Sequence, residues 1–264
     1  MKIAVCLKQV PDTEARLRIS RDGTWIEEED LSFVINESDE CALEEALQIR
    51  EAEGGEVVVF SLGPQRVQES LRKALALGAD RAVHLNDAAF VGGDPVATAR
   101  ALGAAIAGEE CDLVLTGSQS DDLGWGVTAS LVAGHLGMAH AWLVMGVALD
   151  IQSRQVRVVR EMEAGKNEIF RLAIPAVLEV QAGINHPRYA TLKGIMQAKR
   201  KEIKAVAAAD LDLDESVVGA AGSRVEILSV SFPDTGAGAT MIEGDPAAAA
   251  AALVGKLRTE ARVL

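Results

Sequence analysis

The chain has 264 residues, of which 49% are apolar and only 3% aromatic, and it carries a formal net charge of -13. This acidic balance excludes general binding to nucleic acids or anionic membranes, which requires a basic surface. No apolar run approaches the roughly 20 residues of a transmembrane helix, and the N-terminus reads as a short strand rather than a signal peptide. Three cysteines in or beside apolar runs indicate buried, reduced thiols and a cytoplasmic protein.

Strand-like apolar runs alternate with amphipathic segments through the first half of the chain. Strands are expected at residues 2–7, 56–61, 81–85 and 112–116, and a hairpin-like excursion at residues 16–28. Helices are expected at residues 38–53 and 65–77, from Asp94-Pro95 onward, and up to about residue 136. Alternation at this spacing predicts right-handed crossovers and an α/β fold with a mainly parallel, doubly wound sheet.

The pattern changes after Gly137. Strand-like runs at residues 143–149, 155–161, 168–173 and 176–181 follow one another closely and suggest antiparallel strands at one edge of the sheet. From about Ala205 the composition indicates a linker or arm, and a last helix opens at Asp245-Pro246 and runs through six alanines. We therefore divide the chain into a domain of residues 1–190 and an extension of residues 191–264 that packs on a partner.

Ligands of an open parallel sheet bind outside the carboxyl ends of its strands. Four segments are expected there: "LKQVPD", "INESDE", "SLGPQ" and "TGSQSDDLGWGVTAS". In the last, Gly117, Gly124 and Gly126 permit close approach of the backbone, and Thr128 opens a helix whose amides favour a phosphate. The spacing alone is equally compatible with an ordinary strand-to-helix loop. No Walker lysine motif and no G-x-G-x-x-G opening the first helix is present.

Catalytic constellations are missing from the sequence. The four histidines are scattered and have no metal-ligand spacing, and Ser118 and Ser120 have no recognisable base. The pair Asp121-Asp122 is compatible with a metal site, a loop cap or a ribose contact. A nucleotide loop without an acid, base or nucleophile favours a binding role over hydrolysis.

Four longer stretches together resemble the beta subunit of electron transfer flavoproteins. They are "INESDECALEEALQIRE", "SLGPQRVQESLRKALALGADRAVHL", "DLVLTGSQSDDLGWGVTASLVAGHL" and "INHPRYATLKGIMQAKRKEI". The resemblance covers nearly the whole chain and implies an adenine-nucleotide alpha-hydrolase-like fold. It also implies a heterodimer with an alpha subunit that holds most of a redox-active FAD, which the hairpin near residues 13–16 approaches. Electrons would pass from acyl-CoA and other dehydrogenases, as in fatty acid oxidation, to a quinone oxidoreductase or another acceptor.

The resemblance further implies a structural AMP in the beta subunit. The positions that it implies for cofactor binding are Cys6, Asn36, Glu37, Ser38, Asp39, Leu62, Gly117, Ser118, Gln119, Asp121, Asp122, Gly124, Trp125, Gly126, Val127 and Thr128. Gly126 and Val127 replace an Asn-Gln pair of the common type, whereas Thr128 is retained and favours AMP. Two alternatives stay open, a bifurcating relative with a second FAD and a stand-alone adenine-nucleotide module.

A segment that follows the Asn185-His186-Pro187 break would be the loop that recognises dehydrogenases. The resemblance implies an apolar anchor at Leu192 and partner contacts at Leu192, Lys193, Ile195, Met196 and Lys199. Its basic run would favour encounter with acidic surfaces, although a merely solvated helix face is also compatible with the lysines. This run comprises Lys193, Lys199, Arg200, Lys201 and Lys204. Arg188 is expected to brace this loop or the subunit interface.

Overall fold

A nine-stranded, mainly parallel sheet forms the centre of the protein. The computed structural model describes residues 1–234, 236 and 238–264. In the described chain the strand order is β11-β5-β4-β1-β6-β10-β7-β8-β9, and β2 and β3 form a separate small antiparallel pair. The bounds are β1 (Lys2–Cys6), β2 (Gln9–Pro11), β3 (Phe33–Ile35), β4 (Glu56–Leu62), β5 (Arg81–Leu85), β6 (Leu113–Gly117), β7 (Ala139–Asp150), β8 (Gln155–Met162), β9 (Lys166–Ala173), β10 (Ala176–Val180) and β11 (Ile203–Val206).

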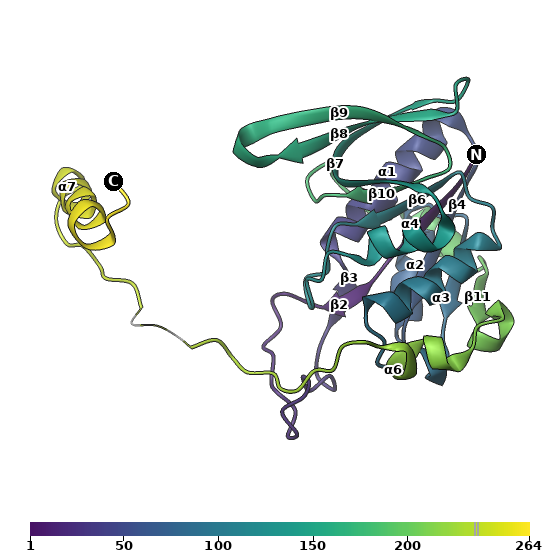
Figure 1. Cartoon of the computed structure of the whole chain (residues 1–264), viewed down its shortest axis with the longest axis horizontal. Coiled ribbons are helices and arrows are strands. Elements are labelled where there is room, and N and C mark those ends of the chain that lie inside the picture. The colour runs from purple at the N-terminus through teal and green to yellow at the C-terminus, as the bar shows by residue number, and fades with distance from the viewer. Residues whose placement is uncertain (235, 237) are drawn as a thin grey trace.

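Helices cover both faces of the parallel part of the sheet (Figure 1). Their bounds are α1 (Glu37–Glu53), α2 (Val67–Leu77), α3 (Pro95–Ala107), α4 (Thr128–Leu136), α5 (Leu192–Ala198), α6 (Gly219–Gly222) and α7 (Pro246–Lys256). Buried side chains of α1, α2 and α5 share one apolar cluster, and those of α3 and α4 share the other. Helices thus pack on both faces of the sheet, and the expected doubly wound α/β fold is confirmed. Successive side chains of the central parallel strands point alternately into the two apolar clusters.

Helix boundaries follow local signals in the sequence. The side chain of Asp94 accepts a hydrogen bond from the backbone N–H of Ala97 at 2.9 Å, and Pro95 occupies the first turn of α3. Asp245 caps α7 in the same way through the N–H of Ala248 at 2.9 Å. Aspartate caps followed by proline need no tertiary help, and both predicted helix starts are confirmed.

The strand β10 departs from the prediction. We expected the run beginning at Ala176 to join antiparallel strands at the sheet edge, but β10 lies inside the sheet and is parallel to both β6 and β7. Every residue of β10 is buried, as is usual for a strand covered on both faces. Only β7, β8 and β9 form the antiparallel edge.

The other edge also extends further than expected. Residues from about Ala205 were predicted to be a linker, whereas β11 pairs in parallel with β5 and places Val206 in the core. Ala208 and Val218 are buried in the same cluster. The sheet therefore continues past residue 190, where we divided the chain. The short pair β2–β3 was likewise not predicted.

The hairpin and the C-terminal arm lie outside this body. A single antiparallel bridge joins Ile19 to Ile26, which confirms a hairpin-like excursion there. In Figure 1 the extended arm leaves the body after α6, and α7 stands clear of the sheet. No residue of α7 is buried, so its alanine-rich surface is not covered within this chain.

Candidate functional site

The sheet has its topological switch point between β1 and β6. From β1 the chain crosses through α1 towards β4, whereas β6 lies on the other side of β1 and leads into α4. The loops that follow β1 and β6 consequently diverge at their carboxyl ends, where open α/β sheets bind ligands. The first turn of α1 contacts the ends of both β1 and β6.

Asp39 joins the ends of the two central strands. Its Oδ2 accepts a hydrogen bond from the N–H of Lys8 at 2.8 Å, and its Oδ1 accepts one from the N–H of Gly117 at 2.7 Å. The side chain is buried, and burial raises the pKa of Asp39 to about 7 although the N–H groups of Lys8 and Gly117 oppose the rise. The buried carboxyl of Asp39 thus connects the carboxyl end of β1 to that of β6.

Asn36 and Ser38 hold the loop after β6. The Asn36 amide donates to the carbonyl of Gln119 at 2.8 Å, and its Oδ1 accepts from the N–H of Asp121 at 2.9 Å. The hydroxyl of Ser38 donates to the same Gln119 carbonyl at 3.0 Å. Asn36 is 1% exposed and Ser38 is 5% exposed, so these side chains hold the loop backbone from the protein interior.

Lys8 secures the loop from the other side, a role that the sequence did not suggest. Its Nζ lies 2.5 Å from the Oδ1 of Asp122 and donates to the hydroxyl of Ser120 at 3.1 Å. Burial raises the pKa of Asp122, but the hydrogen bonds from Lys8 and Ser120 outweigh burial, and the pKa is lowered overall. The paired aspartates therefore differ: Asp122 is engaged by Lys8, whereas the side chain of Asp121 is exposed.

Gly117 permits these contacts because it has no side chain. A Cβ at this position would lie 2.2 Å from the hydroxyl of Ser38 and 2.4 Å from the Oδ1 of Asp39. Both distances are far below van der Waals contact, so any larger residue would separate α1 from the end of β6.

The outer half of the loop is open to solvent. Leu123, Trp125 and Val127 are each 40–45% exposed, and Gly124 and Gly126 have φ values of +61° and +59°. An open cavity of about 690 Å³ lies beside Leu123 and Trp125, with residues 92–94 and 223–227 on its other walls. A left-handed backbone at two glycines turns the chain without strain.

Helix α4 begins at the end of this loop. Its N-cap position, Val127, supplies no side-chain acceptor, so the first amides of α4 keep their hydrogen-bonding capacity. Thr128 is the first helical residue and is half-buried. An uncapped helix start of this kind favours an anion.

The remaining residues expected to bind cofactor lie around the same strand ends. Cys6 and Leu62 end β1 and β4, which are neighbours, and Cys6 is buried in the apolar cluster beneath α3 and α4. Burial raises the pKa of the Cys6 thiol, which makes it a packing group at neutral pH. Glu37 is exposed at the start of α1, and Ser118 is half-buried next to Gly117.

A second surface lies on the segment that follows β10. Leu192 is 83% exposed, Met196 63% and Ile195 42%, and Tyr189 just before them is 95% exposed. Lys193 and Lys199, the two lysines expected to meet partners, are exposed on the same short helix or directly after it. Large apolar side chains exposed together are typical of interaction surfaces.

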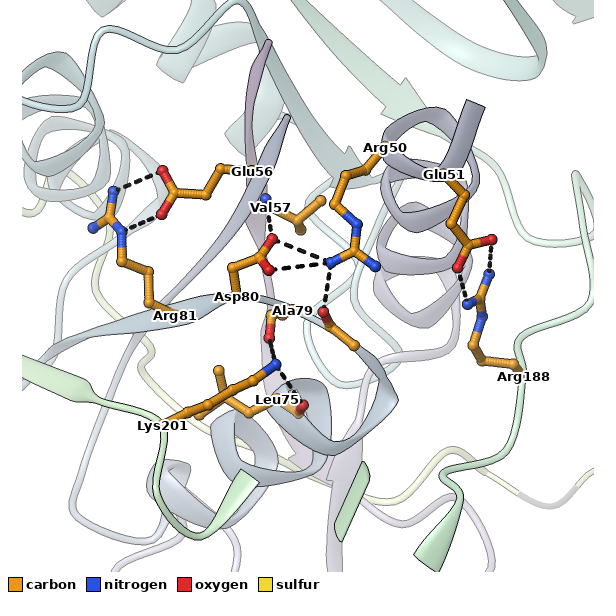
Figure 2. A network of polar contacts seen from close by, with 11 residues as sticks. Arg50, Glu51, Glu56, Val57, Leu75, Ala79, Asp80, Arg81, Arg188 and Lys201 are labelled. Atoms are coloured by element: carbon orange, nitrogen blue, oxygen red, sulfur yellow. Dashed lines mark hydrogen bonds and ion pairs between the residues drawn. The ribbon is translucent and has the colours of Figure 1, made fainter. Parts of the chain in front are cut away.

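Arg188 anchors the beginning of this segment to α1. Its guanidinium donates to the Oε2 of Glu44 at 2.8 Å and to the carboxylate of Glu51, two turns further along α1. Figure 2 shows the contact of Arg188 with Glu51. Asn185 adds a hydrogen bond to the Cys41 carbonyl at 3.0 Å. The interpretation of Arg188 as a brace is confirmed. Glu44 is its buried partner, and the spacing of the sequence gave no sign of that pairing.

Metal-ligand clusters, membrane-spanning helices and the state of the cysteines also bear on the class of protein. Across the described residues, no group of three or more His, Cys, Asp or Glu side chains is placed to hold a metal ion. The helices described here include none with both the length and the apolar character needed to cross a membrane. The three cysteines are buried and free.

The fold and the site define an open, doubly wound α/β protein whose loops converge at the switch point between β1 and β6. A model of the electron transfer flavoprotein domain matches residues 23–211. Among curated proteins, the electron transfer flavoprotein subunit beta of Methylophilus methylotrophus is 41% identical over 96% of this chain and 97% of its own length. The corresponding subunit of Thermoanaerobacterium thermosaccharolyticum is 37% identical over 98% of both chains, and that of Mycobacterium leprae 37% over 88% of both. The chain therefore belongs to the electron transfer flavoprotein family and to its beta-subunit group.

Family membership carries two coarse conclusions. A beta subunit implies an alpha-subunit partner, and the family implies a role in electron transfer with a flavin.

Proposed function

We propose that this subunit holds AMP in the loop of residues 117–128 and, together with an alpha subunit, carries electrons from dehydrogenases to a quinone oxidoreductase or another acceptor. FAD, bound mainly by the alpha subunit, supplies the redox chemistry. In this proposal the beta subunit contributes binding surfaces only, and residues 191–264 carry its contacts with partners.

One observation carries the nucleotide assignment. The inner half of the loop is fastened by Asn36, Ser38 and Asp39, while the outer half presents Gly124, Gly126 and the uncapped start of α4 to solvent. A phosphate fits N–H groups at a helix start, and Thr128 adds a hydroxyl donor there. The buried side chains of Asn36, Ser38 and Asp39 thereby act on the nucleotide by shaping the loop. Lys8 compensates the charge of Asp122.

The test of the nucleotide is its identity in the purified heterodimer. The beta subunit is co-expressed with its alpha subunit, the complex is denatured, and the released nucleotides are separated by chromatography. One FAD and one AMP per heterodimer support the proposal. Two FAD molecules and no AMP assign the chain to the bifurcating alternative, and a single FAD with no other adenine nucleotide removes the assignment of the loop. A beta subunit that stays monomeric in size-exclusion chromatography with its alpha subunit would favour the stand-alone module.

The exposed segment around Leu192 is proposed as the dehydrogenase docking surface. Its apolar side chains offer a central anchor, and exposed lysines around it favour encounter with acidic surfaces and rapid release. The test is the KM of an acyl-CoA dehydrogenase for the heterodimer. Leu192→Ala should raise this KM about tenfold or more, as removal of a central interface anchor does. Val91→Ala, which truncates an aliphatic side chain that is 71% exposed outside the segment, should leave it unchanged.

A further inference from the structure

The helix α5 is too short to be stable by itself. It spans seven residues, Leu192–Ala198, and an isolated helix of that length is not populated in water. Thr191 caps it by accepting a hydrogen bond from the N–H of Gly194 at 3.0 Å, but only Ala198 of the helix is buried. Contacts with other elements must therefore keep the exposed side chains of α5 in place.

Helix α5 lies directly on the end of α2. A Cβ on Gly194 would stand 2.3 Å from the backbone carbonyl oxygen of Ala76, so the two backbones touch at this point. The buried side chain of Ala198 joins the apolar cluster that α2 shares with α1. The small residues Gly194 and Ala198 allow α5 to approach α2 this closely.

Two cations connect the ends of these helices reciprocally. Arg72, on α2, donates to the backbone carbonyl oxygens of Ala198 and Lys201, the latter at 2.8 Å. Lys201, just after α5, donates through Nζ to the carbonyl oxygens of Ala79 at 2.5 Å and Leu75 at 3.4 Å. Each C-terminal end, which lacks intrahelical donors and has negative dipole character, receives a positive charge from the other element.

The acceptor end of α2 is itself fixed in position (Figure 2). Arg50 of α1 donates to the carbonyl of Gly78 at 2.8 Å and lies 3.1 Å from the carboxylate of Asp80. That carboxylate also accepts from the N–H of Val57 at 2.8 Å. Lys201 consequently binds a turn that α1 and β4 already hold.

We propose that Lys201 and Arg72 are positioning residues that clamp α5 onto the end of α2, so that Leu192, Ile195 and Met196 form a preset docking surface. The proposal rests on the docking function assigned to this segment. A partner that needs the ordered segment binds more weakly in proportion to the fraction of molecules in which it is ordered. Loss of the clamp therefore raises the KM for the dehydrogenase and leaves kcat unchanged.

The variants Lys201→Met and Lys199→Met provide a matched test in the purified heterodimer. Both remove one positive charge from the same basic run and keep most of the side-chain length, but Lys199 is exposed and Lys201 is half-buried against α2. Hydrogen exchange should become about tenfold faster or more for the amides of residues 195–201 in Lys201→Met. Lys199→Met should exchange like the wild type. Circular dichroism and flavin content establish that each variant is folded.

The kinetic readout uses the same acyl-CoA dehydrogenase. Lys201→Met and Arg72→Met should raise its KM about tenfold with kcat unchanged, and Lys201→Arg, which keeps the donors, should restore it. Unchanged exchange in Lys201→Met overturns the clamp. The kinetic control is Lys166→Met, at an exposed lysine of β9 outside the docking segment. An equal rise of KM in Lys166→Met, or faster exchange in Lys201→Met without a change in KM, overturns the effect of the clamp on docking. If Leu192→Ala leaves KM unchanged, the docking function itself fails, and exchange alone then decides whether the clamp exists.

Discussion

The carboxylate of Asp39, on the first turn of α1, accepts a hydrogen bond from the backbone N–H of Gly117 at 2.7 Å. These residues are far apart in the sequence, and their contact joins the helix after β1 to the end of β6. The other oxygen of Asp39 binds the N–H of Lys8 at the end of β1. The two loops at the switch point are thus held together by one buried side chain.

Substitution of Gly117 by alanine should destabilise the protein and reduce its nucleotide content. The added Cβ would overlap the hydroxyl of Ser38 and the carboxylate of Asp39, and overpacking of this kind costs roughly 1–3 kcal/mol. Urea denaturation and nucleotide analysis of the heterodimer measure the two effects. The control is Gly134→Ala on α4, where no atom lies within 4 Å of the added Cβ. It should be neutral or more stable by up to about 1 kcal/mol, since alanine favours helices. Equal stability of the two variants would contradict the prediction.

Removal of the Asn36 side chain should release the loop after β6. In Asn36→Ala the N–H of Asp121 loses its partner, at roughly 1–3 kcal/mol for a group left unsatisfied, and the carbonyl of Gln119 keeps only the hydroxyl of Ser38 as a donor. We expect faster hydrogen exchange in residues 118–124 and loss of bound nucleotide, measured on the same sample. Asn167→Ala, at an exposed position of β9, is the control. A variant that keeps full nucleotide content would show that the loop does not need this support.

Acid should weaken the cluster of charges at the opposite ends of the strands. Hydrogen bonds from Arg81 lower the pKa of Glu109 from 4.5 to about 2. Burial opposes this shift, and a hydrogen bond from Lys2 adds to it. A depressed carboxyl pKa stabilises the fold above the unfolded-state value, and that stabilisation is lost as pH falls from about 4.5 to 2. Glu109→Gln should therefore be less stable at neutral pH and should lose less stability across that interval. Urea titrations at several pH values measure this. Glu110→Gln, at the exposed neighbouring residue, should follow the wild-type curve.

Loss of the Arg188 side chain should leave Glu44 buried without its charged partner. The carboxylate of Glu44 is 6% exposed, and hydrogen bonds from Arg188 lower its pKa although burial raises it. Arg188→Met should destabilise the protein by roughly 1–3 kcal/mol in urea denaturation. Arg200→Met, an exposed arginine of the same segment, should change stability by less than about 0.5 kcal/mol. If Glu44→Gln in the Arg188→Met background restores no stability, the cost does not come from the unpaired carboxylate.

Local sequence signals located most elements of the parallel half. The amphipathic run from residue 38, the glycine at position 78 and the aspartate-proline pairs each predicted a boundary within a few residues of the observed one. The run from residue 176 was misplaced because it sits among antiparallel strands in the sequence. Its uninterrupted apolar character was the available sign of a doubly covered, interior strand. The strand β11 was missed since its four residues follow a basic segment and precede an alanine-rich one.

Candidate site residues could be grouped from the sequence but not given roles. Parallel strands bring their carboxyl ends to one edge, so the four loop segments were expected to meet, and the observed contacts between residues 8, 36–39 and 117–122 join three of them. The orientation of each side chain was not predictable. Asn36, Ser38 and Asp39 turn inward to backbone groups of the loop, because buried N–H and C=O groups require partners.

By itself, the sequence determined the alternation of strands and helices, the helix caps, the glycine positions where the backbone turns or packs closely, and the apolar residues of the proposed docking segment. These features depend on neighbours a few residues away. The tertiary structure alone decided the place of β10 and β11 in the sheet, the pairing of Arg188 with Glu44, and the reciprocal contacts of Arg72 and Lys201. Those choices join residues far apart in the chain, and they depend on which buried polar groups lack a partner once the sheet has formed.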